Sequence, residues 1–310
     1  MAVVTSGSWQ KSLLPAVDVW FNDKLNAWES EHKKIFKIRQ SKRAFEQAVG
    51  MSLLGLASVK DQGASLQYDD TQQTYINNFV HDVRALGTII TLEAYRDNQY
   101  SLDALSEKPQ ALADSMNETK EVDHANVLNN AFDSGYTMGA SSDGKELCNS
   151  AHPNGPYGAT QSNILAAADL SETSLEDICI QIDGFKDPRG LQQKITPQTL
   201  LIPRQLRFTA SRILDSTLQN DNASNAINAL KSNNTLPGGY MVNHYLTDTD
   251  AFFVLSSVNE TGKGLVSYDA WPLEFGQDNE FDTFNLKVKA FYRDSKGWID
   301  WRCICGSAGA

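Results

Sequence analysis

The chain has 310 residues, 41% of them hydrophobic and 21% charged, and its 27 basic and 38 acidic side chains give a formal net charge of −11. This composition is that of a globular protein able to bury one or two cores, and it excludes intrinsic disorder. The acidic balance argues against a phosphate-binding surface, because such surfaces cluster Lys and Arg.

We expect no targeting or membrane segment. The sequence contains no run of 18 apolar residues, and its first residues lack the charged flank and apolar centre of a signal peptide. We therefore expect a protein that is made and used in the cytoplasm, without a membrane partner. The one basic stretch, residues 32–43, is interrupted by Ile35, Phe36 and Ile38, which favours a solvated or subunit-facing surface over contact with nucleic acid.

Residues 1–50 are predicted to form an N-terminal arm. An amphipathic stretch from Pro15 to Trp28 has the periodicity of a helix but precedes any core. Trp20, Phe21 and Trp28 would be exposed on so short an arm unless they pack against another surface. The parent domain and a neighbouring subunit are equally good candidates for that surface.

Residues 51–88 are predicted to form an extended β-hairpin. The pattern from Met51 onward has a period of two and is broken at residues 60–63 and 68–70. The return limb, Thr74–His81, has little continuous apolar face and is not expected to be a core strand. We expect the hairpin to act between subunits, with Lys60, Tyr75 and Phe79 as contact candidates.

A long helix is predicted from Lys108 to Phe132, with Pro109 at its start and a length of about 38 Å. The helix face with the most apolar residues also carries unusually many polar ones, so we expect the helix to lie across a sheet with one side in solvent. A second α/β region follows. Its expected elements are a helix with a capping box at residues 173–176, a strand at 199–202, a helix carrying Ala210 and Ile213, and strands near 241–245, 251–258 and 264–268.

The C-terminal stretch is predicted to be a β-hairpin. Apolar residues alternate with polar ones from Leu286 to Tyr292, which is the period of a strand with one buried face. Residues 294–297, Asp-Ser-Lys-Gly, are typical of a turn. The alternation from Ile299 to Cys305 then predicts the returning strand.

Catalytic and metal-binding motifs are absent. There is no strand-linked G-x-G-x-x-G, Walker A loop or H-E-x-x-H, so we predict no catalytic residue, cofactor or metal site. Cys148 and His152 could form a metal pair or a thiol nucleophile with its base, but the Pro and Gly residues that follow favour a turn. Asp69–Asp70 and Asp248–Asp250 are weak cation candidates. His81 and His244 are interpreted as structural.

The four cysteines are too few and too scattered for a disulfide framework, and we expect them to be thiols. They are Cys148, Cys179, Cys303 and Cys305.

Several sequence blocks, in this order, resemble the major capsid proteins of tailed bacteriophages with the Hong Kong 97-type fold, close to the Mu-like head subunit group. The blocks are Asn129–Asp133, Asp143–Cys148 with His152 and Pro153, Thr160–Asn163 with Ala168–Ser171, Leu200–Pro203 with Ala210 and Ile213–Leu214, Asn225–Leu230, Tyr245–Asp250, and Phe281–Thr283 with Gly297–Arg302. Each block alone is weak, but their order in a chain of this length is specific.

The resemblance implies an α+β fold with named parts. The arm would be followed by the E-loop hairpin at 51–88 and by a peripheral domain at 89–190 that contains the spine helix, residues 108–132. An axial domain at 191–279 would gather around five-fold and six-fold axes. A final hairpin at 280–310 would return to the peripheral domain.

The resemblance also implies a function without enzymatic activity. The chain would assemble as pentamers and hexamers into an icosahedral virion shell in the host cytoplasm, enclosing double-stranded DNA without sequence-specific binding. Partners would be further copies, a separate scaffolding protein, a portal and a decoration protein. Lys60 is similar to the family's cross-linking lysine, but the sequence identifies neither its Asn partner nor the acidic catalyst. An encapsulin-like nanocompartment shell and a soluble Cys/His enzyme are the alternatives.

Overall fold

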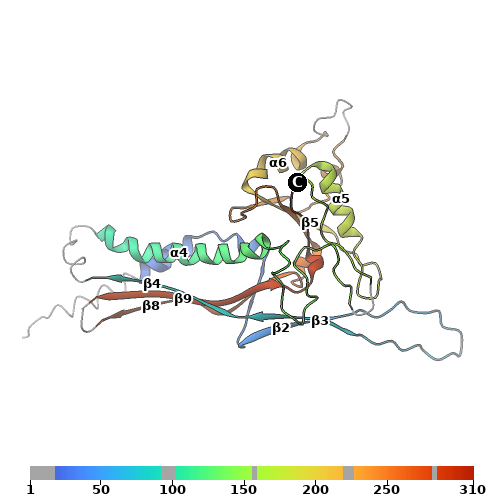
Figure 1. Cartoon of the computed structure of the whole chain (residues 1–310), viewed down its shortest axis with the longest axis horizontal. Coiled ribbons are helices and arrows are strands. Elements are labelled where there is room, and N and C mark those ends of the chain that lie inside the picture. Colours follow the sequence, from blue (N-terminus) through green and yellow to red (C-terminus); the bar gives the residue numbers. More distant parts are fainter. Residues whose placement is uncertain (1–17, 92–101, 156–158, 219–226, 281–284) are drawn as a thin grey trace, which may run out of the picture.

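The computed structural model describes residues 18–91, 102–155, 159–218, 227–280 and 285–310. Figure 1 shows an elongated molecule: a long sheet with a helix lying along it, an upper lobe at one end, and a hairpin that projects past that end. Residues 1–17 of the expected arm, the segment 219–226 and the block Phe281–Thr283 lie outside the described residues. Residues 18–27 of the arm are helical.

The long sheet has the strand order β1-β8-β9-β4. Its strands are β1 (Lys37–Gln40), β8 (Leu265–Asn279), β9 (Leu286–Trp298) and β4 (Asp82–Ile90). β9 is antiparallel to both β8 and β4, whereas β1 is parallel to β8. A short helix, α2 (His32–Ile35), precedes β1.

The long helix, α4 (Leu102–Asn129), lies along this sheet as the polar stripe predicted, but its bounds differ. It begins six residues before Lys108, so Pro109 lies inside the helix rather than at its start, and it ends three residues before Phe132. A proline removes one backbone donor, a loss that tertiary packing can outweigh. Here Leu112 and Met116 of α4 pack on β9 in a small apolar cluster that also contains Phe21.

The upper lobe is built on a second sheet with the order β10-β7-β5-β6. Its strands are β10 (Ile304–Ser307), β7 (Phe252–Ser256), β5 (Pro197–Pro203) and β6 (Tyr240–Asn243). The helices are α5 (Glu172–Asp183), η1 (Arg204–Leu206), α6 (Arg207–Asp215), α7 (Ala229–Ser232), α8 (Ser257–Glu260) and η2 (Trp301–Cys303). The capping box of α5 uses Ser171 and Ser174, two residues earlier than predicted. The larger core fills this lobe and reaches the C-terminal end of α4.

The predicted C-terminal hairpin is wrong. β9 runs straight through residues 294–297, and the hairpin that exists joins β8 to β9. β10 does not return beside β9 but pairs antiparallel with β7 in the second sheet. β8, conversely, belongs to the long sheet, so the chain does not change sheets at the expected boundary between residues 279 and 280.

Residues 294–297 form a strand because distant residues satisfy their polar groups. Ser295 Oγ lies 2.9 Å from His81 Nδ1, and Lys296 Nζ lies 3.1 Å from Asp123 Oδ2. Gly297 is required for packing rather than for a turn, because a Cβ there would lie 2.4 Å from the sulfur of Met138. Turn-forming residue types adopt a strand when such contacts outweigh local preference.

The projecting hairpin consists of β2 (Phe45–Met51) and β3 (Gln73–Val80), joined by residues 52–72. It therefore begins and ends several residues earlier than predicted, and β4 belongs to the long sheet. The return limb is also less independent than its polar sequence indicated. Phe79 is buried in the main core, and Asn77 Nδ2 donates to the carbonyls of Trp298 and Ile299.

Charged side chains join α4 to the long sheet. Asp123 of α4 accepts hydrogen bonds from Arg84 of β4 (Nε–Oδ2 2.8 Å) and from Lys296 of β9. Lys120, one turn earlier, pairs with Asp269 of β8 at 2.9 Å. We call Arg84, Lys120, Asp123, Asp269 and Lys296 the polar seam. It fixes the helix over three strands at once.

Glu121 and His124 extend this contact to the N-terminal segment. Glu121 accepts a hydrogen bond from His32 Nδ1 (2.8 Å) and from the backbone amides of Glu31 and His32. The His124 ring lies 4.4 Å from the His32 ring and contacts Ser267 Oγ of β8 through Nε2 (2.9 Å). Because Nδ1 of His124 faces the Lys120 carbonyl, it carries a proton and donates to that oxygen.

The stability of the subunit should fall on mild acidification because of His124. Burial, and then the neighbouring His32, hold the pKa of His124 well below 6.5. Below about pH 6.5 the unfolded chain binds a proton that the folded chain does not, so stability is lost as the pH falls from about 7 to 5. The contribution of His124 to this loss should approach about 1.4 kcal/mol of unfolding free energy per pH unit. Urea unfolding at several pH values measures the slope of unfolding free energy against pH.

His124→Gln should make that slope less steep, whether or not the unfolding free energy at pH 7 changes. The exposed His244→Gln serves as the control and should keep the slope. His81, whose pKa is also lowered by burial, contributes in the same direction and remains in both variants. An unchanged slope in His124→Gln would show that another group carries the pH dependence.

Candidate interaction surface

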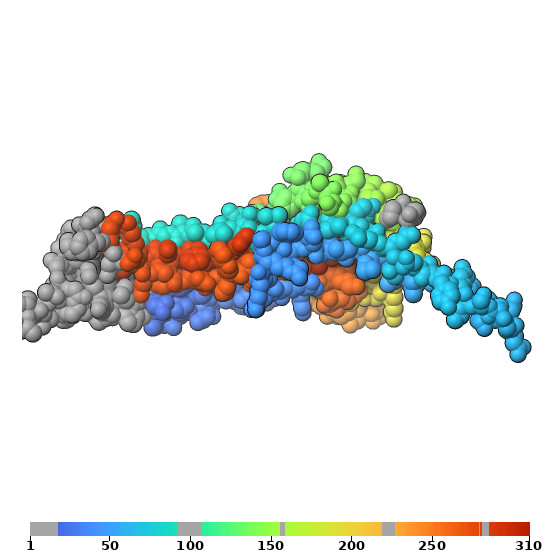
Figure 2. Space-filling view, turned by 90° about the horizontal axis from the view of Figure 1, so that it is seen from below, coloured from blue at the N-terminus to red at the C-terminus, as the bar shows by residue number. Residues whose placement is uncertain are grey.

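The connection between β2 and β3, residues 52–72, projects from the body of the molecule, as Figure 2 shows from below. Its apolar side chains are largely exposed; Val59 is 96% and Tyr68 is 90% solvent-accessible. The others are Leu53, Leu54, Leu56 and Leu66. We call these six residues the loop apolar set. Exposed apolar residues grouped in this way mark a surface that another molecule covers.

The base of this connection is held in place. Backbone and side-chain bonds between Ser52 and Gln72 close it, with a 2.8 Å bond from the Ser52 amide to the Gln72 carbonyl. Arg189, from the loop after α5, binds the Asp69 carboxylate at 2.5 Å and the Asp70 carbonyl. This hydrogen bond lowers the pKa of Asp69 to about 2. Asp69 is thus an anchor of the hairpin, and its carboxylate is engaged by Arg189 and by the Gly55 amide.

Two of the six predicted contact residues are buried within the subunit. Phe21 is 1% exposed and lies 4.6 Å from the ring of Phe275, while Phe79 is 1% exposed and packs edge-on against Tyr268. They cannot reach another subunit without unfolding, so these two assignments are corrected. The arm instead packs on its own domain through Phe21.

The other four candidates remain accessible in part. Lys60 is exposed in the 52–72 connection, and Trp20, Trp28 and Tyr75 are half-buried. They stay predictions as contact residues.

A second group of exposed apolar residues, which the sequence did not predict, lies on β4. Val83, Leu86 and Ile89 are each about half exposed. Within the described residues β4 pairs only with β9, so its outer edge offers unpaired backbone groups. Because side chains alternate along a strand, Val83 and Ile89 lie on one face of β4 and Leu86 lies on the other. The exposed apolar residues are therefore not confined to one face, and a period of two could not identify them.

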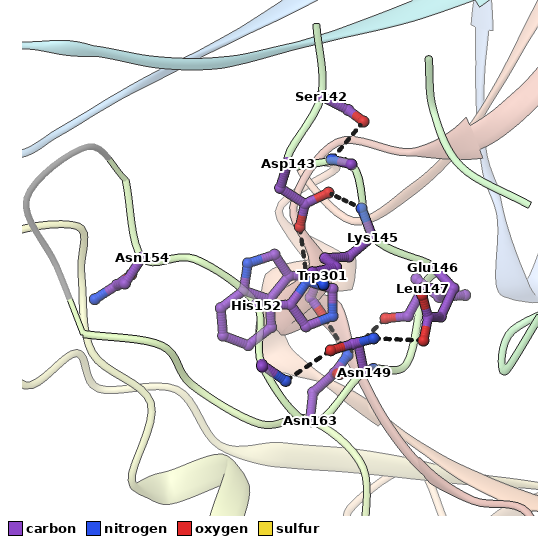
Figure 3. A network of polar contacts seen from close by, with 12 residues as sticks. Ser142, Asp143, Lys145, Glu146, Leu147, Asn149, His152, Asn154, Asn163 and Trp301 are labelled. Carbon is purple, nitrogen blue, oxygen red and sulfur yellow. Dashed lines mark hydrogen bonds and ion pairs between the residues drawn. The ribbon is translucent and has the colours of Figure 1, made fainter. Parts of the chain in front are cut away.

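His152 is a structural residue. Its Nδ1 lies 2.6 Å from Asp143 Oδ2, its ring stacks 4.5 Å from Trp301, and no part of it is exposed (Figure 3). Burial also raises the pKa of the Cys148 thiol well above its usual range, so the sulfur is a poor nucleophile. The pair is therefore unsuited to the thiol chemistry that the sequence left open.

Asn163 is the centre of the same polar network (Figure 3). Its Nδ2 donates to the carbonyls of Leu147, Trp301 and Ile304, and its Oδ1 accepts from the Asn149 amide. Three segments far apart in sequence thus meet at one fully buried amide. The network holds loops together rather than a substrate.

The remaining titratable candidates also have structural partners. His81 lies between Ser41 and Ser295, and His244 contacts Glu31. Asp248 Oδ1 accepts from the backbone amides of residues 250 and 251. In the described part of the chain, no three His, Cys, Asp or Glu side chains are grouped as metal ligands. None of the helices described there is long and apolar enough to span a bilayer.

Comparisons with known proteins agree with this geometry. A family model described as "Phage capsid protein" matches residues 80–306. No curated protein sequence matches the chain. The chain is similar to the capsid of cyanophage P-SCSP1u at 11% identity and a TM-score of 0.57, with 91% of this chain and 88% of that chain covered. It is similar to the capsid of a native GTA particle at 12% identity and a TM-score of 0.56, with 90% of each chain covered. It is similar to the mature capsid of bacteriophage PhiM1 at 11% identity and a TM-score of 0.54, with 90% of this chain and 87% of that chain covered. At these identities they show the fold, which is the expected Hong Kong 97-type fold.

The polar network predicts a sharp difference between two similar substitutions. Asn163→Asp replaces an amide donor by a buried carboxylate facing three carbonyls, so it should lower unfolding free energy by about 3 kcal/mol or more. Asn233→Asp, at an exposed asparagine, should change it by less than about 0.5 kcal/mol. Urea unfolding of both variants measures the difference. Equal small effects would mean that the three carbonyls are satisfied without Asn163.

Proposed function

Because the chain belongs to the phage capsid protein family, it is a non-enzymatic shell subunit of a virion, and we propose that its copies form pentamers and hexamers that close into an icosahedral shell around double-stranded DNA. The loop apolar set carries this proposal. Those six side chains have no core of their own, and a stable contact between copies buries on the order of 800 Å² per partner. Neighbouring copies would supply that cover.

We assign the family's named parts to the described elements as follows. α4 would be the spine helix, and together with the long sheet it would form the peripheral domain. The hairpin from β2 to β3 would be the E-loop. The second sheet with α5 and α6 would be the axial domain. These assignments follow the sheet topology, and so β8 goes to the peripheral domain and β10 to the axial domain.

The finer parts of the proposal are supported by the sequence. Its sequence blocks favour the Mu-like head subunit group. Members of that group would assemble in the host cytoplasm, with a separate scaffolding protein, a portal and a decoration protein as partners. The net charge of −11 favours enclosure of DNA without sequence-specific binding, because an acidic wall repels phosphates.

Shortening the E-loop should block assembly without unfolding the subunit. A short Gly-Ser turn in place of residues 56–66 preserves the Ser52–Gln72 closure and the Asp69–Arg189 anchor while it removes exposed side chains. Subunit stability should change by about 1 kcal/mol or less, because no core contact is lost. Negative-stain microscopy under assembly conditions should show few or no closed shells, and circular dichroism should stay normal.

Point variants refine this experiment. Leu56→Ser with Val59→Ser should also reduce shell yield, whereas the neighbouring polar Gln62→Ser is the matched control and should not. Normal shells from the shortened variant, or its outright unfolding, would refute the role given to the loop. Particles that contain protein cargo rather than DNA in the infected cell would instead favour a nanocompartment.

A further inference from the structure

The upper lobe is basic in one segment, although the whole chain is acidic. Between Asp187 and Asp215 the sequence contains no acidic residue, and it contains five basic ones. They are Arg189, Lys194, Arg204, Arg207 and Arg212. Three of these five arginines and lysines lie on η1 and α6, which follow β5 without a break.

The outer face of η1 and α6 has an aromatic residue between arginines. Phe208 is 74% exposed, and Arg212, four residues later on α6, is exposed on the same side. Arg204 is exposed on η1, directly before α6. In the described residues none of the arginines on η1 and α6 has a carboxylate within ion-pair distance; Arg212 Nε donates only to the Phe208 carbonyl. The carboxylate of Asp215, at the far end of this face, accepts a hydrogen bond from the Ser211 hydroxyl rather than from an arginine. We call Arg204, Phe208 and Arg212 the basic face.

The outer face of α5 has the opposite charge in the same arrangement. Ile180 is 70% exposed, with Asp177 three residues before it and Asp183 three residues after it. The helix contains no basic residue, and the carboxylates of Asp177 and Asp183 have no ion-pair partner among the described residues. We call Asp177, Ile180 and Asp183 the acidic face.

The two faces lie on different sides of the lobe. α5 packs against β10, β7 and β5, and α6 packs against β6, the strand at the opposite edge of the same sheet. Figure 1 shows the two helices on either side of the lobe. A single subunit therefore presents one face in each of two directions and cannot join them to each other.

We propose that the acidic face of one copy binds the basic face of the next copy, head to tail, around each ring of subunits. This proposal rests on the proposed function and names the contact within it. A contact between two different surfaces of identical subunits is heterologous, and such contacts close into rings when the rotation between copies permits. Ile180 would meet Phe208 at the centre, and the carboxylates would pair with the arginines at the rim.

The chemistry of the two faces suits this contact. Aromatic residues and arginine are enriched at the centres of protein interfaces, and an apolar centre with a charged rim is the usual arrangement. Complementary charge at the rim selects the partner and the orientation, because like charges brought together cost several kcal/mol. Two basic faces or two acidic faces would repel, which leaves the head-to-tail arrangement.

Engineered cysteines test the geometry directly. The native cysteines are all buried, so new surface thiols would be the accessible ones. In shells of the double variant Ile180→Cys/Phe208→Cys, mild oxidation should link each subunit to the next and give a ladder of covalent oligomers on a non-reducing gel. Each single variant should stay monomeric on the same gel, because its thiol faces an unmodified surface.

Charge reversal tests the energetics. Arg204→Glu/Arg212→Glu should lower the yield of shells at least ~10-fold, and so should Asp177→Arg/Asp183→Arg. All four changes in one chain restore opposite charges and the native net charge, so assembly should return. Lys33→Glu/Lys263→Glu, at exposed lysines outside α6, is the matched control for the change in net charge and should assemble normally. Circular dichroism verifies that each variant folds.

Three outcomes would overturn the pairing. The first is intact shells whose double-cysteine subunits remain monomeric on the gel. The second is covalent dimers from a single-cysteine variant. The third is a variant with all four charge changes that still does not assemble. Each leaves the capsid function untouched if wild-type shells form. Failure of the wild-type protein to form rings or shells would count against the proposed function itself.

Discussion

The polar seam between α4 and the long sheet is the contact on which the rest of the structure depends. Asp123 binds Arg84 and Lys296 at once, and these belong to strands on different parts of the chain. These ion pairs are only partly buried, and moving the helix along the sheet would separate Asp123 from both of its partners at once. The seam therefore sets the position of the helix along the sheet and keeps β9 extended through residues that would otherwise turn.

The elongated shape follows from this arrangement and has an energetic cost. The helix α4 lies along one face of the narrow sheet, and among the described residues the small apolar cluster around Phe21 packs between them. The main core fills the upper lobe and its junction with α4, and it extends to Phe79 of β3 and to the lobe-side ends of β8 and β9. Much apolar surface is left for neighbouring copies, so assembly should raise the apparent stability of each subunit by mass action.

The sequence predicted those elements whose residues depend mainly on their own neighbours. The helix at Glu172–Asp183 and the strand and helix from Pro197 to Asp215 have regular apolar periods and clear start signals, and the structure confirms them. The fold class followed from a resemblance spread over many short blocks. The burial of Phe21 was left open, since a sequence shows that an aromatic side chain needs cover but not which surface supplies it.

Predictions failed where distant residues determine the local structure. Asp294–Gly297 has the composition of a turn, and only the positions of His81, Asp123 and Met138 make it a strand. Phe79 similarly lies in a polar stretch, and its burial depends on Tyr268 of β8 and on the chain around Gly297 of β9. Exposed surfaces are harder still to predict. The acidic face and the basic face could be identified only once the structure showed which of their residues are exposed and where α5 and α6 lie in the lobe.

The burial of all four thiols has a consequence for how the virion responds to its redox surroundings. Cys148, Cys179, Cys303 and Cys305 are free and enclosed in the lobe, and burial raises the thiol pKa at each site. Without accessible thiolates, disulfide exchange is slow in any redox environment. The covalent structure of the subunit is therefore the same under reducing and oxidising conditions, and a virion built from it needs no redox repair.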